Sequence, residues 1–289
     1  MSFQSFGEIL KQCEEKDKPF WRVILEDDME ERLVSEEESF EKMSRLYMAM
    51  KDADAAYDKD LKSASRLVGG DGEKMHRALL EGKVLGGPFI GAVIAKALKM
   101  GESNACMKKI VAAPTAGSCG VIPAVLLSYE EQYGASWEQM IEAMYVASGV
   151  GEVIAARAFL SGAAGGCQAE IGSASAMAAG ALAYLNGGDI ESIAHAAAMS
   201  IKNLLGLVCD TVGGLVEVPC VKRNVVGAVN AIASADMAVA GIRSQIPPDE
   251  VMDAMREVGE SLPRTLRETG EGGLAATPTG QEIKNQLMM

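Results

Sequence analysis

The sequence predicts an all-α fold, a bundle of many helices joined by glycine-rich loops. Almost every long segment carries helical signals, and almost none alternates apolar and polar residues with the period of two that a half-buried strand requires. Of the 289 residues, 48% are hydrophobic but only 5% are aromatic, so the core has to consist of aliphatic side chains and methionine. Small side chains let helices approach closely, and the 17 methionines are expected to fill the gaps between them.

Three helix starts are marked by local sequence. Ser35 followed by Glu38, and Ser136 followed by Gln139, have the spacing of capping boxes. Pro248 suits the first turn of a helix, where its missing N–H costs nothing. Further helices are expected over residues 88–99, 121–133, 169–185, 190–205 and 225–242.

Glycine-rich breaks separate these helices, and loops carry functional residues more often than helices do. The composition changes near residue 65, which predicts an N-terminal acidic helical region, residues 1–64, and an all-helical main body, residues 65–289. No linker rich in Pro or Ser marks the first region as an independent domain. The breaks lie at residues 68–72, 113–120, 161–166, 206–219 and 269–280, and the last of these is expected to form a lid or cavity wall.

The formal net charge of −13 argues against nucleic-acid binding, because the only dense basic spots are the pairs Lys108-Lys109 and Lys222-Arg223. Residues 171–185 are uncharged but interrupted by Gly and Ser, and shorter than the roughly 20 residues of a membrane-spanning helix. They are expected to form a buried helix. The first residues lack the basic start and apolar run of a signal peptide. We therefore expect a cytoplasmic protein with no membrane and no nucleic-acid partner.

Three of the six cysteines, Cys167, Cys209 and Cys220, lie in the Gly/Ala-rich second half of the chain. In a reducing cytoplasm they do not imply disulfides, and metal binding or catalysis becomes the better explanation. Three thiols are one fewer than structural zinc and electron-transfer clusters use, and a site one ligand short leaves a coordination position for a substrate. The spacing matches neither the short ferredoxin pattern nor paired Cys-x-x-Cys hooks, so buried thiols without a ligand remain the alternative.

The remaining cysteines differ in setting. Cys13 and Cys106 lie in helical sequence and are expected to behave as small hydrophobic residues. Cys119 lies in the loop 113–120, where a reactive thiol or a fourth ligand is a second possibility. His76 and His195 are expected to be exposed or structural, and no mechanism is based on either.

The loop 113–120 has the features of an anion cradle. Gly117 and Gly120 allow tight turns, Thr115 and Ser118 supply hydroxyls, and the following helix offers free amide donors. A substrate carboxylate would fit there. The loop is not a phosphate-binding P-loop, because the Gly-Lys-Ser/Thr element is absent, and ordinary helix capping is the competing interpretation.

A basic pair followed by an amide, Lys222-Arg223-Asn224, comes directly after Cys220. A cation beside thiolates offsets their negative charge or holds a substrate carboxylate, whereas a solvated surface pair is the alternative. We count Lys222 and Asn224, with Thr115, Gly117 and Ser118 of the loop, as candidate substrate ligands.

Several long strings together carry a resemblance to a known family. The chain resembles the alpha chain of bacterial iron–sulfur-dependent L-serine dehydratase (L-serine ammonia-lyase), from about residue 65 to the end. The strings are Ala113-Pro-Thr-Ala-Gly-Ser118, Ser161-Gly-Ala-Ala-Gly-Gly-Cys-Gln-Ala-Glu-Ile-Gly-Ser173, Leu205-Gly-Leu-Val-Cys-Asp210, Gly214-Leu-Val-Glu-Val-Pro-Cys-Val-Lys-Arg-Asn224 and Leu266-Arg-Glu-Thr-Gly270.

The resemblance implies a [4Fe–4S] cluster held by Cys167, Cys209 and Cys220, with the fourth iron free to bind the serine hydroxyl. The iron would act as a Lewis acid that makes hydroxide a feasible leaving group. A base would remove the α-proton, and the resulting enamine would convert to an imine that hydrolyses to pyruvate and ammonia. No pyridoxal phosphate is expected.

One departure from the family pattern concerns the base. The Ser-Ser-Ser-His-Thr motif, carried by a separate beta chain or a fused beta domain and implied to supply the base, is absent here. The catalytic base is therefore expected on a beta-chain partner, and none is assigned in this chain. Some fused relatives end in a cysteine that caps the open iron, whereas this sequence ends Gln286-Leu-Met-Met289.

Other interpretations stay open at this point. A related cluster lyase acting on cysteine or threonine would use the same iron. A non-catalytic iron–sulfur sensor subunit would use the cluster to control partner binding. An all-α scaffold with buried thiols would bind no metal.

Overall fold

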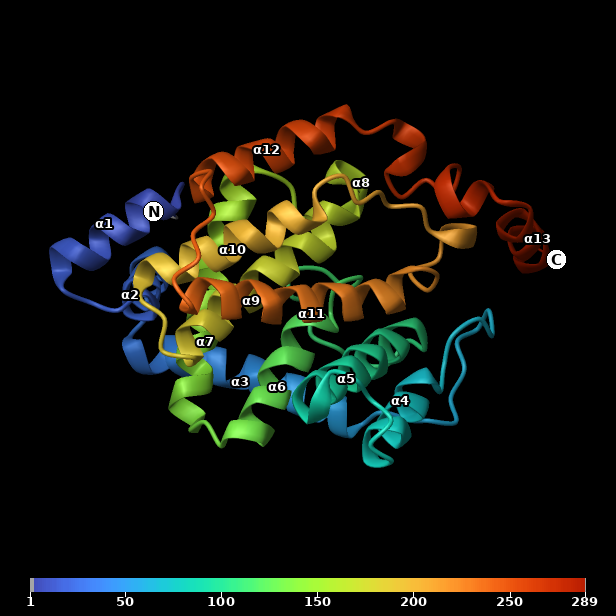
Figure 1. Cartoon of the computed structure of the whole chain (residues 1–289), viewed down its shortest axis with the longest axis horizontal. Helices are drawn as coiled ribbons and strands as arrows, with labels where there is room; N and C mark the ends of the chain where they lie inside the picture. Colours follow the sequence, from blue (N-terminus) through green and yellow to red (C-terminus); the bar gives the residue numbers. More distant parts are fainter. Residues whose placement is uncertain (1–2, 289) are drawn as a thin grey trace.

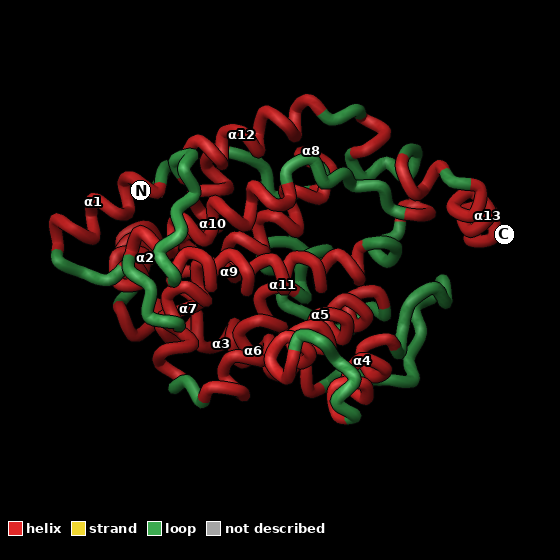
Figure 2. Tube along the Cα trace, viewed as in Figure 1, coloured by secondary structure: helices red, strands yellow, loops and turns green. Residues whose placement is uncertain are grey.

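The computed structural model describes residues 3–288, and over that range it contains α-helices, short π- and 3₁₀-helical turns and no β-strand (Figures 1 and 2). This confirms the predicted all-α fold. The helices are α1 (Phe6–Lys16), α2 (Phe20–Arg32), α3 (Glu36–Ala55), α4 (Asp71–Leu80), α5 (Gly87–Ala105), α6 (Val121–Tyr133), α7 (Trp137–Arg157), α8 (Gly162–Gly165), α9 (Ser173–Leu185), α10 (Ile190–Leu204), α11 (Cys220–Val239), α12 (Pro248–Ser261) and α13 (Pro278–Leu287).

The predicted helix starts are confirmed. Ser35 and Ser136 each accept a hydrogen bond from the backbone N–H three residues on, and the side chains of Glu38 and Gln139 return the bond, so both capping boxes form. Pro248 occupies the first turn of α12. These contacts satisfy backbone groups that a helix end would otherwise leave without partners.

Several predicted helix boundaries are wrong. The helix expected over residues 88–99 runs from Gly87 to Ala105, the helix expected to end at residue 242 ends at Val239, and two further differences lie next to Cys220 and Cys167. The helix expected from residue 225 begins at Cys220 instead, because Pro219 at the N-cap loses nothing by lacking an N–H. The helix expected over residues 169–185 is divided into a π-helical turn, Gln168–Gly172, and α9. The segment after Cys167 is therefore wound more widely than an α-helix.

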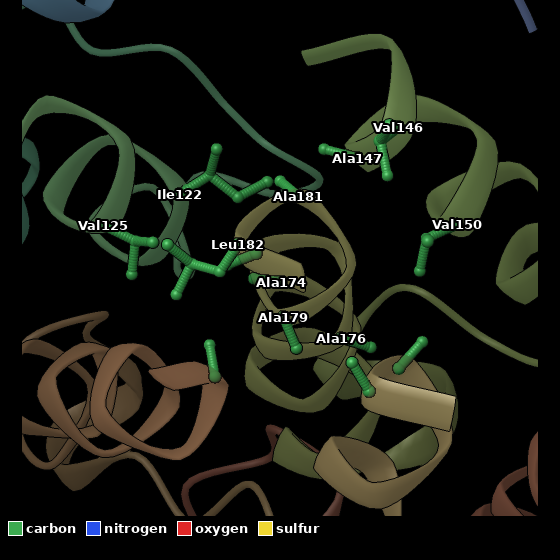
Figure 3. Close-up of a cluster of buried hydrophobic side chains, with 14 of the residues drawn as sticks. Ile122, Val125, Val146, Ala147, Val150, Ala174, Ala176, Ala179, Ala181 and Leu182 are labelled. Carbon is green, nitrogen blue, oxygen red and sulfur yellow. The ribbon is translucent and has the colours of Figure 1, made fainter. Parts of the chain in front are cut away.

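Helix α9 lies at the centre of the hydrophobic core and packs against α6, α7, α10 and α11 (Figure 3). Its small side chains make this possible, since Ala174, Ala176, Ala179 and Ala181 are fully buried against their neighbours. The prediction of a buried helix in this segment is confirmed. No helix between residues 3 and 288 is long and apolar enough to cross a membrane.

Helices α1, α2 and α3 contribute to the same core. Phe6, Phe20 and Tyr47 are buried in one cluster with side chains of α7 and α9. The Ser39 hydroxyl also lies 2.7 Å from the hydroxyl of Tyr145 on α7, in hydrogen-bonding contact. The division into regions 1–64 and 65–289 stays a prediction.

The C-terminal segment packs back on the loop that follows α10. Residue Arg267 forms a single parallel bridge with Cys209, and the backbone N–H of Leu274 donates to the carboxylate of Asp210 over 2.9 Å. The segment then continues to α13, at the end of the long axis opposite α1 (Figure 1). Residues 269–280 thus lie beside the Cys209 loop, and their role as a lid stays a prediction.

Candidate functional site

The fold brings Cys167, Cys209 and Cys220 into one buried region. Cys167 directly precedes the π-helical turn, Cys209 lies in the loop after α10, and Cys220 is the first residue of α11. Their exposed fractions are 2%, 2% and 5%. The charge of Cys167 raises the pKa of both other thiols, so the three are close enough to interact electrostatically.

Burial keeps these thiols protonated at neutral pH while they have no ligand. Desolvation raises the pKa of Cys167 and of Cys220 to about 12, and it raises the pKa of Cys209 still further. A thiol binds a metal as the thiolate, so metal binding has to displace these protons. Buried soft sulfur donors of this kind suit iron–sulfur clusters, zinc and copper(I).

Backbone hydrogen bonds hold Cys209 in place. Its N–H donates to the carbonyl of Leu266 over 2.9 Å, and its carbonyl accepts from the N–H of Glu268 over 2.8 Å. A Cβ at Gly162 would lie 3.0 Å from the Cys209 sulfur and 3.3 Å from a carboxylate oxygen of Glu268. Glycine at position 162 therefore leaves the room that the thiol occupies.

Arg223 is a partly buried cation beside the thiols. Its guanidinium donates a hydrogen bond to Cys167 and another to the carbonyl of Val208 over 2.8 Å. It also forms an ion pair with the buried carboxylate of Asp210, with 2.8 Å between Nη2 and Oδ1. A guanidinium has enough donors to serve all three partners at once.

Lys222, predicted to bind substrate, is not brought to the thiols. Its side chain is 73% exposed and pairs with Asp71 over 3.2 Å. It follows Cys220 by two positions, which places it about 200° around α11 from that cysteine. Of the basic pair singled out in the sequence, the structure turns only Arg223 inward.

The loop 113–120, predicted to receive a substrate carboxylate, already holds a carboxylate of the chain itself. The hydroxyl of Thr115 donates to Glu170 and is in hydrogen-bonding contact with the Ser118 hydroxyl at 3.0 Å. A Cβ at Gly117 would lie 2.5 to 2.7 Å from three atoms of the Glu170 carboxyl group. The loop therefore contacts a carboxylate of the chain, and the binding of a substrate carboxylate by Thr115, Gly117 and Ser118 stays a prediction.

Asn224, also predicted to bind substrate, fastens this loop to α11. Its amide nitrogen donates to the carbonyls of Gly117, at 2.8 Å, and Cys220, at 3.0 Å, and its oxygen accepts from the N–H of Gly120 over 2.8 Å. Both amide hydrogens are used within the protein. Asn224 thus positions the loop relative to Cys220.

Cys119 is buried and turned toward another helix. Its thiol donates to the carbonyl of Met100 on α5, with 3.7 Å between sulfur and oxygen, and burial raises its pKa to about 12.

His195 accepts a hydrogen bond from the N–H of Ser244 over 3.2 Å, which fits the structural role expected for it.

Glu170 is the site residue that sequence reasoning missed. It is 9% exposed, and burial is the main cause of its raised pKa, which the Thr115 hydrogen bond opposes and the charge of Glu268 reinforces. It lies in the π-helical turn, a type of irregularity common at functional sites. An acidic residue three positions after Cys167 was the available signal, but its burial cannot be read from the sequence.

The donor set can be tested against the expected cluster. Across residues 3–288, no three His, Cys, Asp or Glu side chains converge closely enough to bind one metal ion. An iron–sulfur cluster places its own atoms between the thiolates, which bind different irons and need not converge on a point. Three buried, mutually interacting thiols with a guanidinium beside them fit a cluster better than a single ion.

Fold and site together define an all-α protein with three buried thiols, one guanidinium and one carboxylate without a cationic partner. Residues 15–275 match the protein family described as "Serine dehydratase alpha chain". The chain belongs to this family, which confirms the resemblance noted in the sequence.

Relatives with this name match nearly the whole chain. The "Probable L-serine dehydratase, alpha chain" of Bacillus subtilis (strain 168) is 47% identical over 288 residues, 99% of this chain and 95% of the relative. The "L-serine dehydratase, alpha chain" of Peptoniphilus asaccharolyticus is 41% identical over 97% of both chains. The "L-serine dehydratase" of Haemophilus influenzae is 41% identical over 181 residues, 62% of this chain but only 40% of the relative.

Proposed function

We propose that this chain is the alpha subunit of an L-serine ammonia-lyase, which eliminates water from L-serine and releases pyruvate and ammonia. The observation that carries the proposal is the gathering of Cys167, Cys209 and Cys220 in one buried site, in a chain that belongs to the serine dehydratase alpha family. The relatives that match it over nearly their whole length are named for L-serine dehydratase.

The three thiols would hold a [4Fe–4S] cluster. With one iron lacking a protein ligand, the bound cluster would supply a Lewis acid for the substrate hydroxyl. Arg223 offsets the negative charge of the thiolates through its hydrogen bond to Cys167. The backbone bonds to Leu266 and Glu268 fix the Cys209 loop, and burial of all three sulfurs excludes water from them.

Removal of the α-proton of the substrate is assigned to a base on a beta-chain partner. Glu268 is exposed while its carboxylate lies beside the Cys209 sulfur, so the site meets the protein surface there. A partner that covers this edge would bring its own side chains to the substrate. The proposal includes no pyridoxal phosphate and places the enzyme in the cytoplasm.

An anaerobic assay tests the function. The chain is purified with and without a beta-chain candidate, loaded with iron and sulfide, and supplied with L-serine, L-threonine or L-cysteine. Pyruvate formation from L-serine only in the mixture is the expected result. A preference for threonine or cysteine would instead identify a related lyase. A loaded chain that turns over none of the three in either preparation would favour a sensor subunit.

A further inference from the structure

Glu170 is a buried carboxyl group that no cation within residues 3–288 pairs with. Its side chain is 9% exposed, and the only hydrogen-bond donor to its carboxylate in the described part of the chain is the neutral hydroxyl of Thr115. No lysine, arginine or histidine within residues 3–288 forms an ion pair with it. A carboxylate removed from water without a cation is costly in free energy.

The surroundings add negative charge, and no cation within residues 3–288 is among the groups that shift the pKa of Glu170. The carboxylate of Glu268 acts on Glu170, and Glu170 acts in turn on all three cysteines. The guanidinium of Arg223, which lies beside the thiols, is engaged by Asp210, Cys167 and the Val208 carbonyl. Thiolates formed on metal binding would make the region more negative still.

The position of the Glu170 carboxyl group is built into the fold. The backbone at Gly117 approaches it so closely that any side chain at this position would overlap it. The Thr115 hydroxyl holds the carboxyl from the same loop, and Asn224 ties that loop to the start of α11 beside Cys220. Three elements thus fix one unpaired carboxylate next to the thiols.

We propose that Glu170 binds the α-ammonium group of the substrate amino acid, with Glu268 as the second carboxylate at the exposed edge. The inference rests on the proposed function, since it takes L-serine as the ligand of this site. The ammonium group supplies the cation that the site lacks, and its N–H donors make charge-assisted hydrogen bonds to carboxylates. Glu170 is then a specificity-determining residue that distinguishes amino acids from hydroxy acids of similar shape.

The discriminating probe is 3-hydroxypropionate, which keeps the hydroxyl and carboxylate of L-serine but has no amino group. A site built to bind the ammonium rejects this analogue because Glu170 stays unpaired. Replacing Glu170 with the neutral, isosteric Gln removes that basis for discrimination. The matched control is Glu217→Gln, because Glu217 is also buried but bonds the hydroxyls of Ser63 and Ser65.

The experiment uses the cluster-loaded complex of this chain with its beta chain. It compares wild type, Glu170→Gln and Glu217→Gln. The KM for L-serine is measured by pyruvate release, and the Kd of radiolabelled 3-hydroxypropionate by equilibrium dialysis. We expect Glu170→Gln to raise the KM about 30-fold or more, the effect of removing one partner of a buried charge pair. Its Kd for 3-hydroxypropionate should stay within about threefold of wild type, and Glu217→Gln should change neither constant.

Two results would overturn the inference while leaving the proposed function intact. One is an unchanged KM for L-serine in Glu170→Gln, and the other is an equal loss of affinity for both ligands, which indicates a structural role. If Glu170→Gln fails to fold or to retain iron, Thr115→Val replaces it, and a smaller rise in KM with unchanged 3-hydroxypropionate binding is expected. Wild-type complex that turns over no L-serine would instead refute the function itself.

Discussion

Two adjacent cations on α11, Lys222 and Arg223, have different roles, although no sequence pattern distinguishes one from the other. The rotation of about 100° between successive residues of an α-helix directs Lys222 to the solvent and Arg223 to Cys167 and Asp210. Arg223 is the side chain whose donors fit several acceptors at fixed angles. At the scale of single residues, the site therefore depends on which side of the helix a charge occupies.

Replacing each cation with Met tests this assignment. Arg223→Met leaves the carboxylate of Asp210 buried and unpaired, so we expect a loss of roughly 3–5 kcal/mol in the free energy of unfolding, together with a lower iron content. Lys222→Met should change stability by less than about 0.5 kcal/mol and retain wild-type iron. Denaturant unfolding and iron analysis after anaerobic reconstitution measure both, and equal iron in the two variants would refute the role of Arg223.

Glu170 predicts a pH dependence of stability in the metal-free chain. Its pKa is raised in the folded state, mainly by burial, so the folded protein binds its proton more tightly than the unfolded chain does. This stabilisation is complete below the unfolded value of about 4.5 and is lost as the pH rises through the higher folded value.

The variant Glu170→Gln should remove the loss of folding stability that the wild type shows as the pH rises. At pH 7.5 we expect its Tm to exceed that of the wild type by roughly 2–4 °C, the shift that about 1 kcal/mol produces in a protein of this size. At pH 4.5 the difference should shrink. Thermal unfolding at the two pH values measures it, and a variant less stable than wild type at pH 7.5 would contradict an unbalanced charge at this position.

At the scale of elements, the site forms where irregular segments meet. The loop 113–120, the π-helical turn Gln168–Gly172 and the first turn of α11 are joined by Thr115 and Asn224. The loop and the π-helical turn depart from a regular α-helix, and the third segment is the start of one. These contacts help to bring Cys167 and Cys220, which are far apart in the sequence, to one place.

The close approach of Gly117 to Glu170 predicts a measurable coupling. Gly117→Ala places a Cβ within 2.5 to 2.7 Å of the carboxyl group, so we expect about 1–3 kcal/mol of destabilisation from overlap. In a Glu170→Ala background the same change should cost much less. Gly7→Ala, where the added Cβ meets only atoms at 3.6 Å or beyond, is the control. Equal costs of Gly117→Ala in both backgrounds would contradict the contact.

The elements were predictable where local chemistry decides them. The capping boxes at Ser35 and Ser136 and the buried Ala-rich helix α9 follow from contacts within a few residues. The inward turn of Glu170 depends on tertiary packing, which no local pattern encodes. The cysteines were found because residue type limits their chemistry, whereas the carboxylate in the anion cradle comes from a segment 55 residues away from Thr115.

At the scale of the whole molecule, a cluster would connect segments that are otherwise joined only by weaker contacts. Cys167 directly precedes the π-helical turn, Cys209 lies in the loop after α10, and Cys220 begins α11. A ligand that binds only the folded arrangement stabilises it in proportion to its affinity. Stability and cluster content should therefore vary together.

Cluster loading should accordingly raise the Tm of the full chain. At least about 4 °C is expected, because binding far above the dissociation constant adds several kcal/mol. Removing iron with a chelator under anaerobic conditions should return the Tm to its initial value. Unfolding curves of loaded, unloaded and chelator-treated protein test this prediction. Superimposable curves would show that the three thiols do not jointly hold a cluster.

Counting iron and sulfide shows whether the three cysteines hold one cluster. The chain is reconstituted anaerobically as wild type and as Cys167→Ser, Cys209→Ser, Cys220→Ser and Cys119→Ser. We expect about four irons and four sulfides per chain in the wild type and in Cys119→Ser, with most of both lost from each of the other three. Wild-type protein without iron, or undiminished iron in the Cys167, Cys209 and Cys220 variants, would contradict it.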